Sequence, residues 1–131
     1  MIRRIVSDER GATAVETALI LPAFLLVVFG IIEFGRGVWV QAALQYAVSQ
    51  AARCASLQSS SCTDVPSYAA SNTLGLTVPS STFTYTSGAS CGITAYTKGY
   101  QVTASYQFSS VVGGLIPQLA SITLRAKSCH P

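Results

Sequence analysis

The side chains best suited to covalent chemistry in this sequence are four cysteines and one histidine. Cys54, Cys62, Cys91 and Cys129 form an even set, and none of their spacings is the CxxC of common zinc sites. In an exported segment such a set predicts two disulfides, with three possible connectivities, and a four-cysteine zinc site is the alternative. We prefer Cys54–Cys62, which closes a short loop, together with Cys91–Cys129, which holds the C-terminus.

Enzymatic catalysis has little support in the sequence. His130 is the single histidine and has no convincing acid partner, and no GxSxG nucleophile motif is present. A nearby cysteine and His130 would make a nucleophile–base pair, but disulfide formation would consume that thiol. We therefore predict a protein that is not an enzyme, holds no metal and no cofactor, and acts on no small-molecule substrate. An exported enzyme is the least favoured alternative.

A glycine followed five residues later by a glutamate is the sharpest local signal. Gly11 ends a charged leader, and Glu16 lies within the apolar stretch that follows. A carboxylate at the centre of a membrane helix costs about 2.5–3.5 kcal/mol. Glu16 lies nearer the edge, so it either snorkels to the membrane surface or has a function. We prefer a function, since a charge removed from water needs a partner.

Charged and apolar residues are segregated along the chain. Six of the thirteen charged residues lie in the first sixteen positions, and none lies from Thr17 to Ile32. Residues 12–32 form a stretch that, as a helix, spans roughly 30 Å, the thickness of the hydrocarbon core of a bilayer. Pro22 is compatible with this assignment because membrane helices tolerate proline. The sequence therefore predicts one transmembrane helix.

The membrane topology follows from the flanks of this stretch. A cleaved secretory signal is the alternative, but the apolar run is long and no convincing small-x-small cleavage site follows it. Basic residues precede the run, which predicts a cytoplasmic N-terminus and places residues 33–131 across the membrane. Trp39 then lies at the membrane exit, where interfacial anchoring is favoured over a ligand contact. The net charge of +3 is too small and scattered for nucleic-acid binding.

Residues 33–56 contain no proline and continue the helical pattern beyond the membrane. Gly35 and Gly37 weaken the helix locally and permit a bend. Beyond them, residues four apart form a polar row, an apolar row and a row of small residues: Gln41, Gln45, Ser49 and Arg53; Leu44, Val48 and Ala52; Ala43, Ala47, Ala51 and Ala55. The small row allows close approach of another helix or of the C-terminal domain. We expect both, with packing inside the chain favoured after about Gln45.

The C-terminal half is rich in serine and threonine and predicts a small sheet. Asp64 lies near the start of a possible short helix that Gly75 would stop. Alternating apolar and polar residues predict strands over 82–86, 91–97, 100–108 and 121–127, with one wet face. The inward-facing residues of the last two strands are Tyr100, Val102, Ala104, Tyr106 and Phe108, and Ile122, Leu124 and Ala126. The predicted class is α+β, a long helix packed against a small antiparallel sheet.

Several of these features resemble the TadE-like family, pilin-like proteins of the tight-adherence (Tad, or Flp-type) pilus machinery. The matching pieces are Gly11, Ala14-Val15-Glu16, Leu21-Pro22 and Ile32-Glu33-Phe34-Gly35-Arg36. The resemblance implies that a prepilin peptidase cuts between Gly11 and Ala12. The new amino group would then pair with Glu16 of a neighbouring subunit and set the packing register. Thr17 replaces the aromatic residue of the major Flp pilins, which argues against the bulk pilin.

The sequence predicts four segments: a cytoplasmic leader (1–11), a transmembrane helix (12–32), an extracytoplasmic helix extension (33–56) and a disulfide-stapled β-rich domain (57–131). The resemblance implies a minor pilin or pseudopilin in the bacterial inner membrane, with incorporation into the pilus left open. Its partners would be other pilus subunits, inner-membrane platform proteins and the prepilin peptidase. The alternative function is a signal-anchored binding module, which would need the anchor but neither Gly11 nor Glu16.

Overall fold

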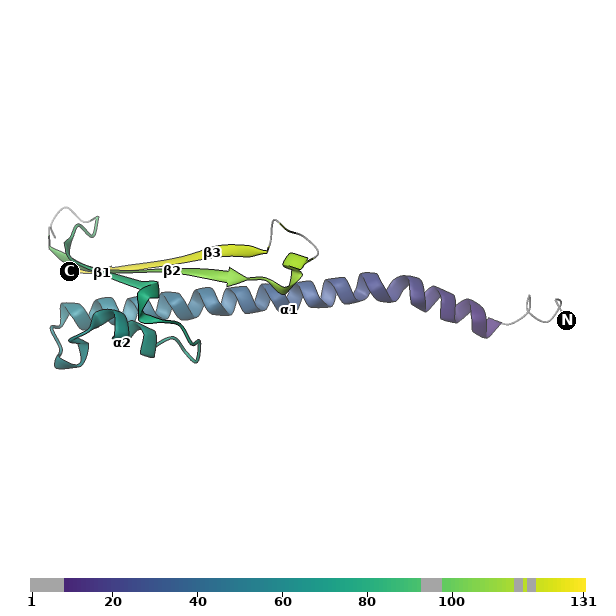
Figure 1. Ribbon diagram of the computed structural model, residues 1–131, viewed down its shortest axis with the longest axis horizontal. Helices are drawn as coiled ribbons and strands as arrows, with labels where there is room; N and C mark the ends of the chain where they lie inside the picture. Colours follow the sequence, from purple (N-terminus) through teal and green to yellow (C-terminus); the bar gives the residue numbers. More distant parts are fainter. Residues whose placement is uncertain (1–8, 93–97, 115–116, 118–119) are drawn as a thin grey trace. The chain divides into compact units, whose positions relative to one another are not determined.

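The computed structural model describes residues 9–92, 98–114, 117 and 120–131. The elements along the chain are α1 (Glu9–Ser56), η2 (Ser60–Cys62), α2 (Val65–Ser71), η3 (Ser80–Thr82), β1 (Phe83–Ala89), β2 (Gly99–Ser109), η4 (Val111–Gly114) and β3 (Ser121–His130) (Figure 1). The fold is α+β, which confirms the predicted class. The chain divides into two compact units, Met1–Gly35 and Arg36–Pro131.

The first unit contributes the N-terminal part of α1, whose apolar side chains are exposed. Leu19, Phe24 and Ile31 are 75%, 59% and 67% exposed. This helix is long and apolar enough to cross a membrane. Pro22 lies inside it and removes one backbone donor, a change that membrane helices accommodate.

The second unit is built on a three-stranded antiparallel sheet in the order β1-β2-β3. Phe83, Ala104 and Ala126 lie side by side across it. The predicted strands over 100–108 and 121–127 lie within β2 and β3. The strand predicted over 82–86 corresponds to β1, which begins at Phe83. For the strand predicted over 91–97, the first two residues lie outside any strand, and 93–97 lie outside the described residues.

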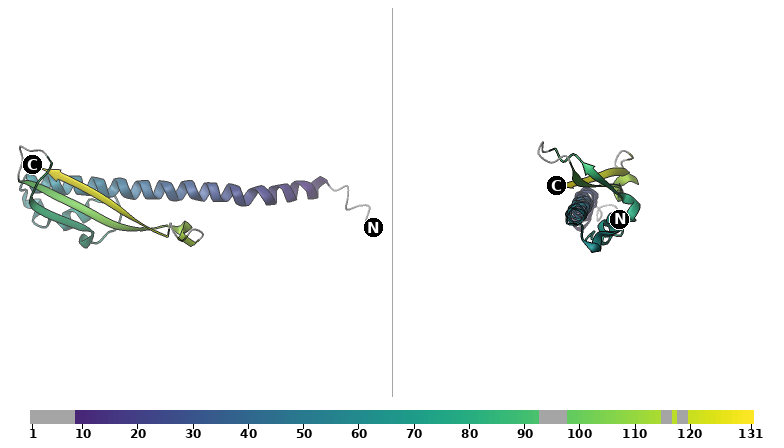
Figure 2. Two further views of the ribbon diagram at one scale, coloured as in Figure 1. Left: turned by 90° about the horizontal axis from the view of Figure 1, so that it is seen from above. Right: turned by 90° about the vertical axis from the view of Figure 1, so that its left-hand side faces the viewer.

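The core of the second unit lies between α1, the inner face of the sheet and α2 (Figure 2). Leu44, Val48 and Val102 are its largest fully buried side chains. The whole row of small residues is buried here: Ala43, Ala47, Ala51 and Ala55. Packing inside the chain therefore accounts for this row. Ala43, the first residue of the row, is also buried inside the chain, although we expected this part of the row to contact another helix as well.

Helix α2 is shorter than the sequence predicts. It begins after Asp64, whose side chain makes no capping hydrogen bond, and it ends at Ser71 rather than near Gly75. The side-chain amide of Asn72 and the hydroxyl of Thr73 donate to helix carbonyls at this end. Because these side chains satisfy the last carbonyls, the helix stops four residues before the glycine.

Candidate functional site

The predicted processing site lies in the first turns of α1. The helix begins at Glu9, so Gly11 and Ala12 are already helical. Both residues are exposed, as is Glu16, and a Cβ on Gly11 would meet nothing within 4 Å. Glycine is about 1 kcal/mol less favourable than alanine in a helix, and helix ends fray. The space that a side chain at position 11 would occupy is therefore open, and the glycine lowers the local stability of the helix.

Ala12 and Glu16 are four residues apart on one helix and so lie on the same face. A free amino group at Ala12 would therefore stand one helical turn from the Glu16 carboxylate of its own chain, roughly 6 Å along the axis. Nearby, the Thr17 hydroxyl donates to the Thr13 carbonyl at 2.9 Å, so that hydroxyl is satisfied within the helix. The Glu16 side chain is exposed on this face of α1.

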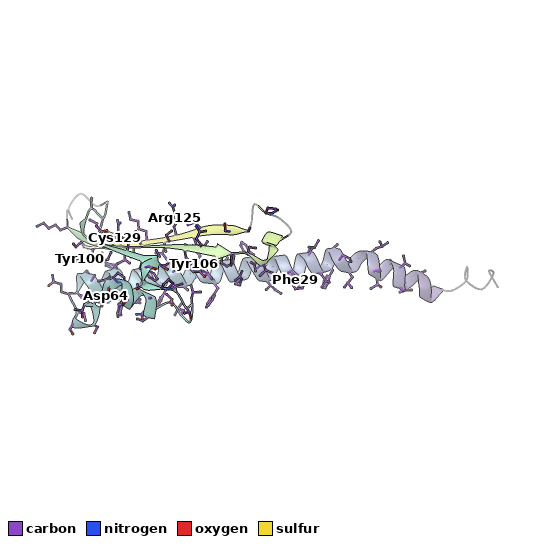
Figure 3. The ribbon with its side chains drawn as sticks, viewed as in Figure 1. Phe29, Asp64, Tyr100, Tyr106, Arg125 and Cys129 are labelled. Carbon is purple, nitrogen blue, oxygen red and sulfur yellow. A yellow bond between two sulfur atoms is a disulfide. The ribbon has the colours of Figure 1, made fainter. Side chains whose placement is uncertain are left out.

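The four cysteines form two disulfides, Cys54–Cys62 and Cys91–Cys129, which is the connectivity preferred from the sequence. The first joins the end of α1 to η2, with Cα atoms 6.1 Å apart. The second joins the segment after β1 to β3, with Cα atoms 5.6 Å apart. Cys129 lies at the same end of the sheet as Tyr100 (Figure 3). Within the described residues no cluster of three or more cysteine, histidine or acidic side chains is placed to hold a metal ion.

Gly99 serves the second disulfide, a role that the sequence did not reveal. A Cβ at this position would overlap the sulfur of Cys91 and would lie 3.1 Å from the carbonyl oxygens of both Ala89 and His130. Only a residue without a side chain fits there. Local sequence holds no signal for this requirement, because the crowding comes from two segments outside β2, residues 89–91 and the end of β3 at His130.

Two glutamines of the polar row fasten α1 to the edge strand β3. Gln41 Nε2 donates to the carbonyl of Arg125 at 2.8 Å, and Gln45 Nε2 donates to the carbonyl of Lys127 at 3.1 Å. Four helical residues rise about 6 Å, and two strand residues rise about 6.6 Å, so the two spacings match. The spacing of the glutamines therefore suits a strand that runs alongside the helix, although the spacing alone does not identify that strand.

Arg36 is fixed at the other end of the helix–sheet contact. Its Nη2 donates to the carbonyl of Ser109 at 2.6 Å, and its guanidinium carbon lies 4.4 Å from the centre of the Phe108 ring. The contact with β2 was missed because it joins residues 73 positions apart.

Comparison with known proteins identifies the N-terminal part of the chain. Residues 11–53, about a third of the sequence, match the family model of TadE-like proteins. The resemblance drawn from Gly11, Glu16 and the apolar stretch is thereby confirmed over this segment. Comparisons with curated proteins and with solved structures give no match.

Proposed function

We propose that this TadE-like chain is a membrane-anchored minor pilin or pseudopilin that takes part in the assembly of Tad/Flp-type adhesive pili. The observation that carries the proposal is the family match over residues 11–53, which includes Gly11, Glu16 and the whole apolar part of α1. A role in assembly rather than catalysis fits a chain whose specific contacts hold a helix to a sheet.

The anchor would be the exposed apolar part of α1. Its side chains have no apolar cover in the described chain, and a bilayer would supply it. The basic residues before the helix favour a cytoplasmic N-terminus, with the second unit outside the cytoplasm. The two disulfides support the same orientation, because disulfides persist in oxidising compartments such as the periplasm.

Processing would remove the charged leader. A prepilin peptidase would cut between Gly11 and Ala12 on the cytoplasmic side and leave the apolar helix in the membrane. The start of α1 at Glu9 adds a requirement, since proteolysis needs the first helical turn to open. Gly11 lowers the cost of that opening, because glycine destabilises a helix relative to other residues.

After cleavage, Glu16 would neutralise the new amino group of an adjacent subunit. Its own chain offers the same pairing across one helical turn. The amino group of a neighbouring subunit would replace that of the same chain as the partner of Glu16 where packed helices exclude water. A charge pair removed from water is favourable only when its two groups are in close contact. Glu16 would thus favour one axial register between packed helices. The partners would be other pilus subunits and the inner-membrane platform.

The experiment that tests the proposal is mass spectrometry of the mature N-terminus in membranes with and without the peptidase. We expect a peptidase-dependent chain that begins at Ala12, and we expect Gly11→Ala to slow the cut. An intact Met1 in both strains would overturn processing and leave a signal-anchored binding module. A start near residue 40 would overturn the anchor, since it would indicate an ordinary secretory signal.

A further inference from the structure

One end of the second unit is fixed beside the residue at which the chain enters it. Arg36 bonds the carbonyl of Ser109 at 2.6 Å and lies over the Phe108 ring. A Cβ on Gly37 would lie 3.8 Å from the same ring. The end of β2 therefore lies close to Arg36, the residue that follows Gly35 in the chain. This proximity depends only on the chain and on contacts inside the second unit.

This end exposes large apolar side chains from three elements, η4, β3 and α1. Val111 follows β2 and is 82% exposed. Ile122 lies opposite Phe108 in the sheet register and belongs to the inner row, yet it is 42% exposed. Val38 and Trp39, one turn beyond the entry point on α1, are 52% and 46% exposed. We call these four residues the apolar rim.

Arg36 is the charged side chain fixed beside the apolar rim, and the connection that carries Val111 lacks charge. The connection between the last two strands, from Ser110 to Ala120, contains no charged residue in the sequence. Its described members Pro117 and Ala120 are exposed. The exposed Val111 side chain has little to gain from water, whereas the interfacial region of a bilayer accepts apolar side chains and tryptophan.

We propose that the apolar rim inserts into the interfacial region of the same bilayer that α1 crosses, as a second membrane contact. The inference rests on the anchor in the proposed function. Lipid is favoured over a second copy of the chain by charge. Residues 36–131 carry five basic side chains and one acidic one, a formal charge of +4. Anionic lipid headgroups attract this basic unit, whereas a copy of equal charge repels it.

Depth-dependent quenching of tryptophan by brominated lipids tests the proposal in the full, oxidised chain. Trp39 is the only tryptophan, so each single-tryptophan variant is made in a Trp39→Phe background. Val111→Trp reports on the apolar rim. Leu57→Trp is the matched control, because Leu57 is 69% exposed but lies roughly 30 Å further along the chain from Arg36. Phe29→Trp reports on the anchor.

The chains are placed in single-copy nanodiscs of phosphatidylcholine and phosphatidylglycerol with bromine near either end of the acyl chain. We expect Val111→Trp to emit at shorter wavelength than Leu57→Trp and to lose emission to bromine near the headgroup. Leu57→Trp should lose none, and Phe29→Trp should respond to deep bromine. Phe29→Trp without quenching would overturn the anchor and the inference with it.

With Phe29→Trp quenched, two results would overturn the inference alone. Val111→Trp that is quenched no more than Leu57→Trp would show that the apolar rim stays in water. The emission of Val111→Trp could instead shift to shorter wavelength only when several copies share one disc, with no quenching by bromine. This result would assign the apolar rim to a contact with a second copy of the chain.

Discussion

Gln41 donates its side-chain amide to the backbone carbonyl of Arg125 across 84 positions of sequence, at 2.8 Å. Gln45 repeats the contact one helical turn later with Lys127. The Arg125 side chain is carried by the same edge strand and points away from α1 (Figure 3). An open strand edge is a template for pairing with another chain. The two amides occupy carbonyls of that edge, so the helix both supports the sheet and protects it.

Loss of these amides is expected to weaken the second unit. Gln41→Ala should lower the free energy of unfolding by about 0.5–1.5 kcal/mol, the usual net value of one hydrogen bond. Gln50→Ala is the matched control, because nine residues further on it lies on the opposite side of α1. Urea unfolding of the full chain in detergent micelles measures both. Equal effects of the two substitutions would contradict the role of Gln41.

Gly99→Ala is expected to prevent formation of one disulfide while sparing the other. The new Cβ would overlap the sulfur of Cys91. The Cβ could not shift aside, because the carbonyl oxygens of Ala89 and His130 lie only 3.1 Å from it. Mass spectrometry after alkylation should therefore find free Cys91 and Cys129 alongside an intact Cys54–Cys62 pair. Gly114→Ala is the control, since a Cβ there meets nothing within 4 Å. A fully oxidised Gly99→Ala chain of normal stability would refute the steric argument.

The two disulfides are expected to differ in the stability that they supply. Their sequence separations are 8 and 38 residues. The chain-entropy relation gives about 2.5 kcal/mol for the shorter loop and about 4 kcal/mol for the longer one. Replacing Cys91 and Cys129 together by alanine should thus destabilise the second unit more than replacing Cys54 and Cys62. The reverse order in urea unfolding would indicate that native contacts, rather than loop entropy, dominate.

Arg36 is expected to hold the end of β2 through the shape of its side chain as well as its charge. Arg36→Lys keeps the charge but loses the planar group that both bonds Ser109 and lies over Phe108. The backbone amide of Ser110, which bonds the carbonyl of Ala120, reports on this end by hydrogen exchange. It should exchange faster by a factor of about five, equivalent to ~1 kcal/mol. Arg53→Lys, on the exposed part of the same helix, should leave the rate unchanged.

Local patterns predicted the strands well because a strand's period is a property of its own residues. The alternation from Tyr100 to Phe108 placed Val102 and Phe108 in the core, where the structure has them. Ile122 follows the same alternation in β3 but remains exposed. Whether an inward residue is covered depends on how far the helix extends over the sheet, which local sequence does not reveal. The end of α2 at Ser71 escaped prediction for a similar reason, since competing side-chain bonds decided it.

Some residues of the candidate site could be recognised from the sequence, and others could not. Gly11 and Glu16 are recognisable from sequence because their meaning lies in linear spacing, and the family match over residues 11–53 covers them. Gly99 and Gln41 act through segments distant in the chain, so their roles needed the fold. The peptidase cut after Gly11 and the pairing of Glu16 with the new amino group remain predictions.

Glu16 is expected to matter only after the leader has been removed. If its partner is the amino group created at Ala12, Glu16→Gln should reduce cross-linking between neighbouring subunits in membranes. In an uncleaved Gly11→Val chain that amino group does not exist, so adding Glu16→Gln should cause little further loss. The double-mutant cycle therefore predicts strong non-additivity between two positions that do not touch.

Two controls separate this pairing from simpler explanations. Each variant is first checked for insertion and for its N-terminal residue, because a glutamine that impaired cleavage would mimic the effect. Glu16→Asp keeps the charge on a shorter side chain and should restore part of the cross-linking, as a charge pair requires. Equal losses from Glu16→Gln in cleaved and uncleaved chains would contradict the pairing. They would assign Glu16 to a contact that exists before processing, such as one with the membrane surface.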